Sequence, residues 1–249
     1  MLKQTKRVTR PISRAFQTRY RGMRRLINDR APPWIGRRAD SAFDYFDVLF
    51  VDHGIFRAIY PNRHKLAADT WRSAQPAPRD IRRLAKRGIR TIINLRGERD
   101  CGSYRLQQAA CNRYGIRLIN FSVKSRQAPT ARIIHAAKEL FDSIEYPMLM
   151  HCKSGADRAG LMSTLYMILK QGVPVQEAMR QLSLFYGHIK QADTGVLDLV
   201  FESYLAHNSH QPISFLDWVD RYYDSAATDQ TFRASGLANV VVNKVLRRE

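Results

Sequence analysis

The stretch "MLMHCKSGADRAGLM", Met148 to Met162, decides the fold. An apolar run ends in His151 and Cys152, a loop of five residues leads to Arg158, and a small-residue, apolar stretch follows. The apolar run is typical of a buried strand, and the stretch after Arg158 has the composition of a buried helix. A strand, a short loop and a helix in this order indicate one unit of an α/β fold.

The rest of the chain repeats this alternation. Strand patterns occupy residues 69–76, 89–95, 116–123 and 146–152, and helix patterns occupy 77–88, 103–115, 128–144, 159–172, 174–187, 194–208 and 212–224. Strands that alternate with helices predict parallel pairing with helices on both faces. The expected fold class is therefore α/β, with a central, mostly parallel sheet of about four to five strands flanked by helices.

The charge is uneven along the 249 residues. The chain has 41 Lys and Arg against 22 Asp and Glu, a net charge of +19, and residues 1–40 hold 12 Lys and Arg against only two acids. We expect residues 1–40 to be a basic, flexible N-terminal arm. A transit peptide and a segment that lies on anionic lipid are the alternatives. A basic surface favours phosphate-bearing partners.

Three further segments follow the arm. Residues 41–66 carry apolar side chains at helical spacing and are expected to form an amphipathic helix, packed on the domain or lying at a membrane interface. Residues 67–224 are the predicted α/β domain, and residues 225–249 are a poorly patterned C-terminal tail. No apolar run reaches the length of a membrane span, and the start lacks the apolar core of a signal peptide.

Cysteine usage predicts a reducing compartment. Cys101, Cys111 and Cys152 form an odd, sparse set without a CxxC pair, so we expect neither a disulfide framework nor a zinc site. No metal and no cofactor is expected. We predict a cytoplasmic protein, with peripheral membrane attachment and organellar targeting as open alternatives.

The loop after residue 152 has the residues of a phosphate-transfer site. The preceding strand delivers Cys152 to the carboxyl edge of the sheet, where ligands bind in open α/β folds. Backbone N–H groups that lead into a helix N-terminus form an anion cradle, and Gly155 permits the tight turn. Arg158 offers two parallel donors to phosphate oxygens, and the same positive field favours the thiolate of Cys152. The loop is thus predicted to bind a phosphoryl group and attack it.

The segment "HCKSGADRAG" resembles the His-Cys-x5-Arg signature of the cysteine-dependent phosphatases, the protein-tyrosine and dual-specificity superfamily. "TWRSAQPAPRDIRRLAKRGIRTIINLRGE", residues 70–98, is similar to the opening of a bacterial and fungal-type subgroup, and the likeness covers about residues 68–190. The resemblance implies that 67–224 is a phosphatase domain. It also implies that Cys152 forms a phosphocysteine intermediate, that Arg158 stabilises the transferring group and that His151 supports the thiolate.

The candidate phosphate-binding residues follow from the same loop. They are Lys153, Ser154, Gly155, Ala156, Ala159 and Gly160, and Arg96 is a supporting residue that contacts phosphate, orients the loop or forms a structural ion pair. Lys153 resembles the lysine of lipid-directed members, although it could instead face solvent or pair with an acid. We expect His188 and His135 to be structural or surface residues.

Two departures from the resemblance concern the mechanism. The family's general acid lies on a loop that here reads "FSVKSRQAPT", Phe121 to Thr130, without an acidic residue. Asp157 is the candidate acid, and it resembles the in-loop aspartate of myotubularin-type phosphatases; the alternative is an ion pair that shapes the loop. Ala159 stands where the family usually has Ser or Thr. Ser154 would have to supply the hydroxyl that this residue normally provides.

The sequence therefore predicts a phosphomonoester hydrolase of the protein-tyrosine or dual-specificity type. Two alternatives stay open: a lipid phosphatase that acts on a phosphoinositide, phosphatidylglycerophosphate or lipid A at a membrane surface, and a catalytically weak phosphate-binding module. The expected partners are a phosphorylated protein or phospholipid and, through the basic arm, an anionic membrane. Nucleic acid is disfavoured as a partner.

Overall fold

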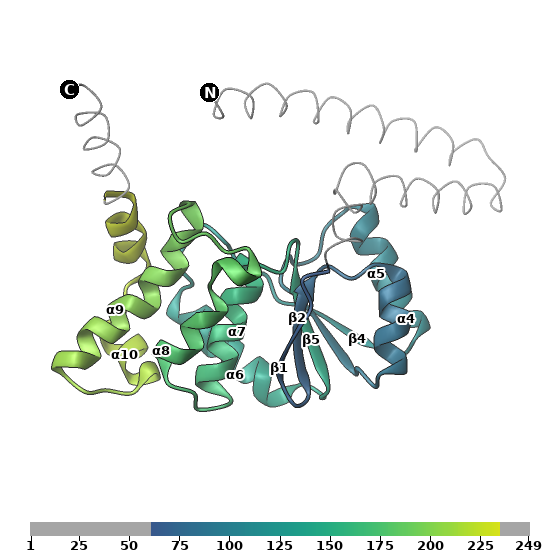
Figure 1. The fold of residues 1–249 in the computed structure, drawn as a ribbon, viewed down its shortest axis with the longest axis horizontal. Helices are drawn as coiled ribbons and strands as arrows, with labels where there is room; N and C mark the ends of the chain where they lie inside the picture. The colour runs from purple at the N-terminus through teal and green to yellow at the C-terminus, as the bar shows by residue number, and fades with distance from the viewer. Residues whose placement is uncertain (1–60, 235–249) are drawn as a thin grey trace, which may run out of the picture.

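A computed structural model describes residues 61–234 (Figure 1). The predicted basic arm at 1–40, most of the predicted helical segment at 41–66 and the end of the predicted tail lie outside the described residues.

One sheet forms the centre of the described structure (Figure 1). Its strands are β1 (His64–Ala67), β2 (Thr70–Ala74), β3 (Thr91–Asn94), β4 (Arg117–Asn120) and β5 (Met148–Cys152). Their spatial order is β1-β2-β5-β3-β4, and all pairs are parallel except the antiparallel β1–β2 pair. The predicted fold class, a mostly parallel sheet of four to five strands, is confirmed.

Helices cover both faces of this sheet (Figure 1). They are α4 (Pro78–Lys86), α5 (Gly102–Arg113), α6 (Ala131–Ser143), α7 (Asp157–Leu169), α8 (Val175–Ala178), α9 (Val196–His210) and α10 (Phe215–Arg221), with 3₁₀ turns at Met179–Gln181, Leu184–Tyr186 and Asp193–Gly195. Local signals set several helix ends. Pro78 opens α4, the Asp80 carboxylate accepts the Ala77 N–H at 3.2 Å, and Thr130 caps α6.

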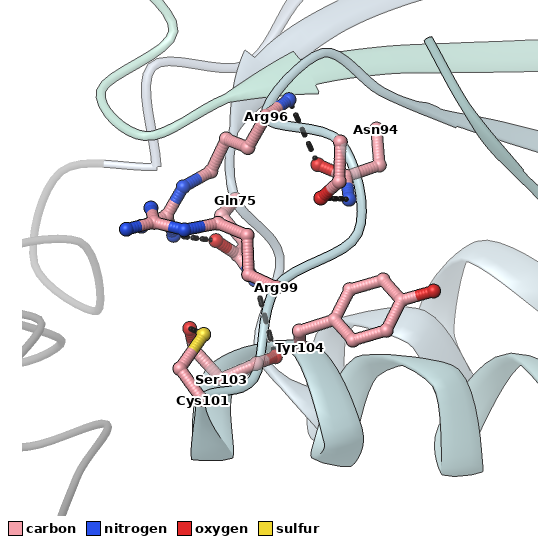
Figure 2. A pocket seen from close by; sticks show the side chains of 8 residues that line it. Gln75, Asn94, Arg96, Arg99, Cys101, Ser103 and Tyr104 are labelled. Carbon is pink, nitrogen blue, oxygen red and sulfur yellow. Dashed lines mark hydrogen bonds between the residues drawn. The ribbon is translucent and has the colours of Figure 1, made fainter. Parts of the chain in front are cut away.

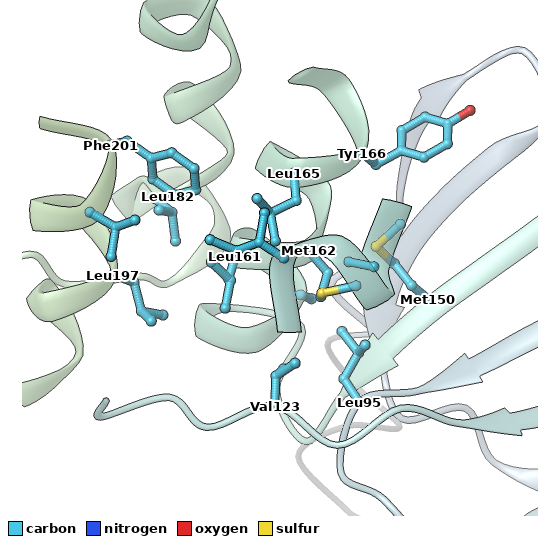
Figure 3. Packing of buried hydrophobic residues seen from close by; sticks show 14 of the residues in the cluster. Leu95, Val123, Met150, Leu161, Met162, Leu165, Tyr166, Leu182, Leu197 and Phe201 are labelled. Atoms are coloured by element: carbon cyan, nitrogen blue, oxygen red, sulfur yellow. The ribbon is translucent and has the colours of Figure 1, made fainter. Parts of the chain in front are cut away.

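Two apolar clusters hold the layers together. The smaller cluster lies between the sheet and helices α4 and α5, with Ile81, Cys111 and Leu149 among its buried members. The larger cluster lies on the opposite face, where α7 and α9 both contribute buried side chains (Figure 3). Helix α7 is buried along most of its length, which explains why its sequence is apolar without a polar face. This burial fixes the N-terminus of α7 at the end of β5.

The structure corrects two details of the predicted elements. The end of the segment 41–66, expected to be helical, contains the start of β1, because these residues pair with β2 across a tight turn. The predicted helix at 174–187 breaks after Gln181, and its remainder is a short turn followed by Gly187 with φ +80°. The carbonyl of Gln181 accepts a hydrogen bond from Arg72, and this long-range contact competes with helix continuation.

Part of the predicted C-terminal tail packs on the domain. Residues 225–234 are helical, the Asp229 carboxylate accepts the Ala128 N–H at 2.8 Å, and Phe232 packs against the larger core cluster. Within residues 61–234, no helix is both long and apolar enough to cross a membrane.

Candidate active site

The loop between β5 and α7 lies at the carboxyl edge of the sheet. Strand β5 pairs with β2 on one side and β3 on the other, and it ends at Cys152. Helix α7 begins at Asp157, so its first N–H groups lack acceptors within the helix. The structure thus places a thiol and a helix N-terminus at the position where open α/β sheets bind ligands.

Gly155 is required by the geometry of this loop. Its φ is +77°, and an added Cβ would lie 2.6 Å from the backbone nitrogen of Ala74 and 2.8 Å from the carbonyl carbon of Ser73. Neither backbone atom can move without disturbing β2. The predicted role of Gly155 in a tight turn with a close approach is consistent with this geometry.

The thiol of Cys152 faces into the loop. The Gly155 N–H donates to its Sγ at 3.2 Å, and the residue is 2 % exposed. Burial lowers the pKa of Arg158; the negative charge of Cys152 opposes this change, and the positive charges of Arg96 and Arg99 add to it. Arg158, Arg96 and Arg99 therefore act electrostatically on one small region. A thiolate and a phosphate dianion are the kinds of group that such a region stabilises.

Arg72 fixes the phosphate-binding loop through hydrogen bonds to its carbonyl oxygens. It is fully buried, and its Nη2 donates to the carbonyl oxygens of Gly155 at 2.7 Å and Ala156 at 3.0 Å. Its Nη1 donates to Gln181, and its guanidinium lies over the Tyr186 ring, 4.0 Å from the centroid. Burial lowers the pKa of Arg72 to about 10, against the opposing effects of Tyr186 and of nearby negative groups. At neutral pH this residue is still a cation.

A second buried residue fastens the loop to its neighbours. The Asn62 side chain donates to the carbonyl oxygens of Ser154 and Tyr186, both at 2.9 Å. The loop and the segment around Tyr186 are therefore held by shared contacts to Asn62 and Arg72. The sequence gave no indication of this role for Asn62.

A chain of buried polar side chains connects Arg96 with the backbone of Cys152. Arg96 Nη1 donates to Gln75, Gln75 Nε2 donates to Gln107 at 3.1 Å, and Gln107 Nε2 donates to His151 Nε2 at 2.5 Å. The His151 Nδ1–H then donates to the Cys152 carbonyl at 3.2 Å. His151 thus contacts Cys152 through its backbone, and the glutamines of this chain were not identified from the sequence.

A pocket adjoins this chain (Figure 2). It is lined by Gln75, Asn94, Arg96, Gly97, Arg99, Cys101, Ser103 and Tyr104. Arg99 is exposed and Arg96 is buried, so the pocket combines one fixed and one accessible guanidinium. Both are close enough to influence Arg158 electrostatically. Arg99 was not among the predicted site residues, because an arginine in a charged turn carries no distinguishing signal in the sequence.

Asp157, the candidate general acid, has an ionic partner. Its carboxylate accepts a hydrogen bond from His188 Nδ1 at 2.9 Å, and the second ring nitrogen of His188 lies 2.7 Å from Asp198. The Asp157 side chain is 27 % exposed, whereas His188 is 1 % exposed. Asp157 is therefore partly exposed, and it also forms an ion pair of the kind that the sequence left open as its alternative role.

The other predicted phosphate-binding residues differ in their surroundings. Lys153 is half-buried, Ser154 is exposed, and Ala156 and Ala159 are buried. The N–H of Gly160 donates to the Ala156 carbonyl at 2.7 Å, and an added Cβ there would lie 2.7 Å from the Leu182 side chain. Gly160 thus contributes close packing to the site, and its N–H group is already used.

The loop where the family's acid would lie is basic in the structure too. Lys124 and Arg126 are exposed, and Arg126 lies 3.8 Å from Asp193. Among residues 61–234, no cluster of three or more histidine, cysteine, aspartate or glutamate side chains could hold a metal ion.

The sheet order and this loop agree with the class of cysteine-dependent phosphatases of the dual-specificity and protein-tyrosine type. The sequence model of the family described as "DSP-PTPase phosphatase fused to NAD+ Kinase" matches residues 59–194, and the chain belongs to this family. The resemblance stated from the sequence is thereby confirmed at the level of the superfamily.

One curated relative is the dual specificity protein phosphatase TpbA of Pseudomonas aeruginosa. It is 24 % identical over 122 residues, which is 49 % of this chain and 53 % of the relative. The matched region thus spans about half the length of the curated relative.

Several solved structures are similar to this chain. The crystal structure of P. aeruginosa TpbA has a TM-score of 0.47 at 20 % identity and covers 64 % of this chain and 88 % of its own. Tk-PTP in its active form has a TM-score of 0.46 at 17 % identity, with 58 % and 98 % covered. PTPMT1 has a TM-score of 0.44 at 18 % identity, with 60 % and 99 % covered.

Proposed function

We propose that the protein hydrolyses phosphate monoesters through a phosphocysteine intermediate on Cys152. The observation that carries this proposal is the loop geometry: Arg72 holds the Gly155 and Ala156 carbonyls, and the Gly155 N–H donates to Sγ. In a planar trans peptide the C=O and N–H point in opposite directions, so N–H groups of the same units face away from Arg72. These donors are free to cradle a phosphate above the thiolate.

The reaction has two steps in this proposal. The Cys152 thiolate attacks phosphorus, Arg158 binds two equatorial oxygens, and the leaving-group oxygen takes a proton from Asp157. Water then attacks the phosphocysteine and the sulfur–phosphorus bond breaks, which returns the thiolate and releases phosphate. Ala159 is buried in the core and offers no hydroxyl to help the sulfur leave. We therefore expect the second step to limit the turnover rate.

The first candidate substrate is a phosphoprotein. The family description and the name of the TpbA relative both refer to dual-specificity phosphatases, and this supports phosphotyrosine and phosphoserine or phosphothreonine as substrates. Arg99 at the rim of the pocket is a second cation for an acidic peptide.

A phospholipid is the second candidate, and exposed apolar side chains favour it. Leu184 is 75 % exposed, Phe185 is 68 % exposed and Ile189 is 49 % exposed, on the segment that Asn62 fastens to the phosphate-binding loop. Apolar side chains beside the phosphate-binding loop suit a membrane surface, where they enter the interface while the loop receives an anionic headgroup.

A substrate panel tests both proposals. Phosphate release is measured from p-nitrophenyl phosphate, phosphopeptides and phosphatidylglycerophosphate in vesicles, with the wild type, Cys152→Ser and the buried control Cys111→Ala. We expect Cys152→Ser to abolish release and Cys111→Ala to retain it. Equal rates for Cys152→Ser and the wild type would leave only a phosphate-binding module.

The same panel separates the substrates. The lipid proposal predicts that Leu184→Ser lowers the ratio of vesicle-borne to soluble turnover, whereas Tyr222→Ser, an exposed aromatic residue on another element, leaves that ratio unchanged. Release from phosphopeptides without release from vesicles would remove the lipid proposal.

A further inference from the structure

A buried histidine connects two carboxylates behind the phosphate-binding loop. His188 Nδ1 lies 2.9 Å from Asp157 Oδ1, and His188 Nε2 lies 2.7 Å from Asp198 Oδ2. The His188 and Asp198 side chains are 1 % and 6 % exposed, whereas the Asp157 side chain is 27 % exposed. The three groups form a line from Asp198 in α9, through His188, to Asp157, the first residue of α7.

The geometry determines the protonation of His188. Each ring nitrogen faces a carboxylate, and an ionised carboxylate only accepts hydrogen bonds, so both nitrogens must carry a proton. Burial lowers the pKa of His188, but the hydrogen bonds to Asp157 and Asp198 outweigh it and raise this pKa to about 9. His188 is thus an imidazolium at neutral pH, with a proton directed at the candidate acid.

Other charges surround this line. Lys190, which pairs with Glu202, also interacts electrostatically with Asp198, while Arg72 and Arg158 interact with Asp157. The two carboxylates and the imidazolium have a net charge of −1, and these cations balance it. The loop from Phe121 to Thr130 contains no carboxylate that could supply a proton instead.

We propose that His188 is the positioning residue that holds Asp157 and supplies it with the proton for the leaving group, with Asp198 fixing the imidazole. This inference rests on the proposed function, because it needs Asp157 to be the acid. It goes further by assigning the source of the proton to a residue outside the phosphate-binding loop.

The proton balance closes over the two steps. As the phosphorus–oxygen bond breaks, its electron pair stays on the leaving oxygen. The ionised Asp157 takes the proton of His188 Nδ1–H and passes it to that oxygen, so Asp157 is again a carboxylate. The new sulfur–phosphorus bond and a neutral imidazole result. When water attacks phosphorus, its proton passes through Asp157 back to Nδ1, and the electron pair of the sulfur–phosphorus bond returns to Cys152.

The dependence of rate on the leaving group tests this relay. We compare kcat/KM for p-nitrophenyl phosphate, phenyl phosphate and an alkyl phosphate in the wild type, His188→Asn, Asp157→Asn and the double variant. General acids contribute about 10²–10⁴-fold. We expect His188→Asn to lower the phenyl and alkyl rates about 10²-fold or more, and the p-nitrophenyl rate far less, because nitrophenolate leaves without a proton. The double variant should lose no more than Asp157→Asn alone.

Each of the other outcomes overturns one defined part of the proposal. Equal losses for all substrates in His188→Asn, with a steep leaving-group dependence in Asp157→Asn, would leave Asp157 as acid and reduce His188 to a structural residue. No leaving-group dependence in Asp157→Asn removes the acid assignment and this inference together, while an inactive Cys152→Ser still supports the nucleophile.

A second variant guards against a folding failure of His188→Asn. Asp198→Asn keeps an acceptor for Nε2–H but removes the charge. We expect it to move the alkaline limb of the wild-type pH–rate profile for phenyl phosphate to lower pH. Thermal unfolding of every variant checks that it is folded, and an unmoved alkaline limb in folded Asp198→Asn overturns the relay.

Discussion

Arg72 Nη2 lies 2.7 Å from the carbonyl oxygen of Gly155 and so connects the second strand of the chain with the phosphate-binding loop. The arginine is fully buried, yet it is a cation, and the oxygens of the loop and of Gln181 solvate it. A buried cation with several carbonyl acceptors is a costly group to place, and it fixes the position of every acceptor.

We expect Arg72→Lys to impair both folding and catalysis. Lysine keeps the charge but lacks the planar fork that reaches two acceptor groups at once, so loop carbonyls lose their donor. The free energy of unfolding should fall by about 2–4 kcal/mol, and a loop displaced by about 1 Å should cost roughly 100-fold in kcat/KM. Urea unfolding and p-nitrophenyl phosphate turnover measure these effects, with Arg79→Lys on the exposed face of α4 as control. Wild-type values for Arg72→Lys would contradict the account.

Gly155→Ala offers a comparison of two strained glycines. The φ angles of Gly155 and Gly172 are +77° and +66°, but a Cβ on Gly172 would meet nothing within 4 Å. The backbone penalty of about 1–2 kcal/mol applies to both alanine variants. Only Gly155→Ala adds a clash with β2, so it alone should abolish turnover, which steady-state assays measure. Equal behaviour of the two variants would show that the close approach to Ala74 is unimportant.

The centre of the site could be predicted because its signal is local. The apolar run, the glycine and the arginine lie within fifteen consecutive residues, and a strand that leads through a loop into a helix follows from their pattern. The parallel sheet was predictable for a similar reason, since alternating strands and helices leave few other arrangements.

The surrounding support could not be predicted, because its contacts join distant parts of the chain. His188 bonds to a residue 31 positions earlier, and Gln107 bonds to His151 44 positions later. Glutamine and histidine in such places look like surface residues in a sequence. Strand β1 and the break after Gln181 were missed for the same reason: tertiary contacts outweigh local preference there.

We expect Gln107→Leu to weaken the support of His151. Gln107 is fully buried, and its amide is the donor for His151 Nε2, so leucine leaves this nitrogen without that hydrogen bond. The free energy of unfolding should fall by about 1–3 kcal/mol. Denaturant titration measures it, and Gln108→Leu, the exposed neighbour in α5, is the matched control. A larger loss for Gln108→Leu would contradict the polar chain.

The thiols should differ in their reaction with iodoacetamide. Burial raises the pKa of Cys111 to about 12, and the thiolate is the reactive form, so Cys111 should remain unmodified in the folded protein. Cys152 should react, and inorganic phosphate should protect it if the loop binds the anion as proposed. Peptide mass spectrometry reports both, and denaturation in urea should expose Cys111. Modification of Cys111 before Cys152 in the folded protein would count against the assignment of the nucleophile.

The ion pairs of His188 should make stability depend on pH. The pKa of His188 is raised to about 9 in the folded protein, compared with about 6.5 for an unperturbed histidine. A group whose pKa is raised by folding contributes its full stabilisation at pH values below its pKa in the unfolded state. This stabilisation is lost as the pH rises through its pKa in the folded state. The difference in unfolding free energy between wild type and His188→Asn should thus be largest near about pH 6 and shrink by about 2–3 kcal/mol toward about pH 9.5.

Urea unfolding across this pH range measures the difference, with His135→Asn as control. His135 also pairs with a carboxylate, Asp220 at 2.6 Å, but this pair is exposed, and exposed pairs contribute only about 0–1 kcal/mol. A pH-independent difference between wild type and His188→Asn would show that the histidine is held by packing alone. If the difference in unfolding free energy from the wild type shrinks with rising pH for His188→Asn and not for His135→Asn, the buried imidazolium itself joins α7 to α9. Both variants remove one histidine, but only His188 is buried between two carboxylates.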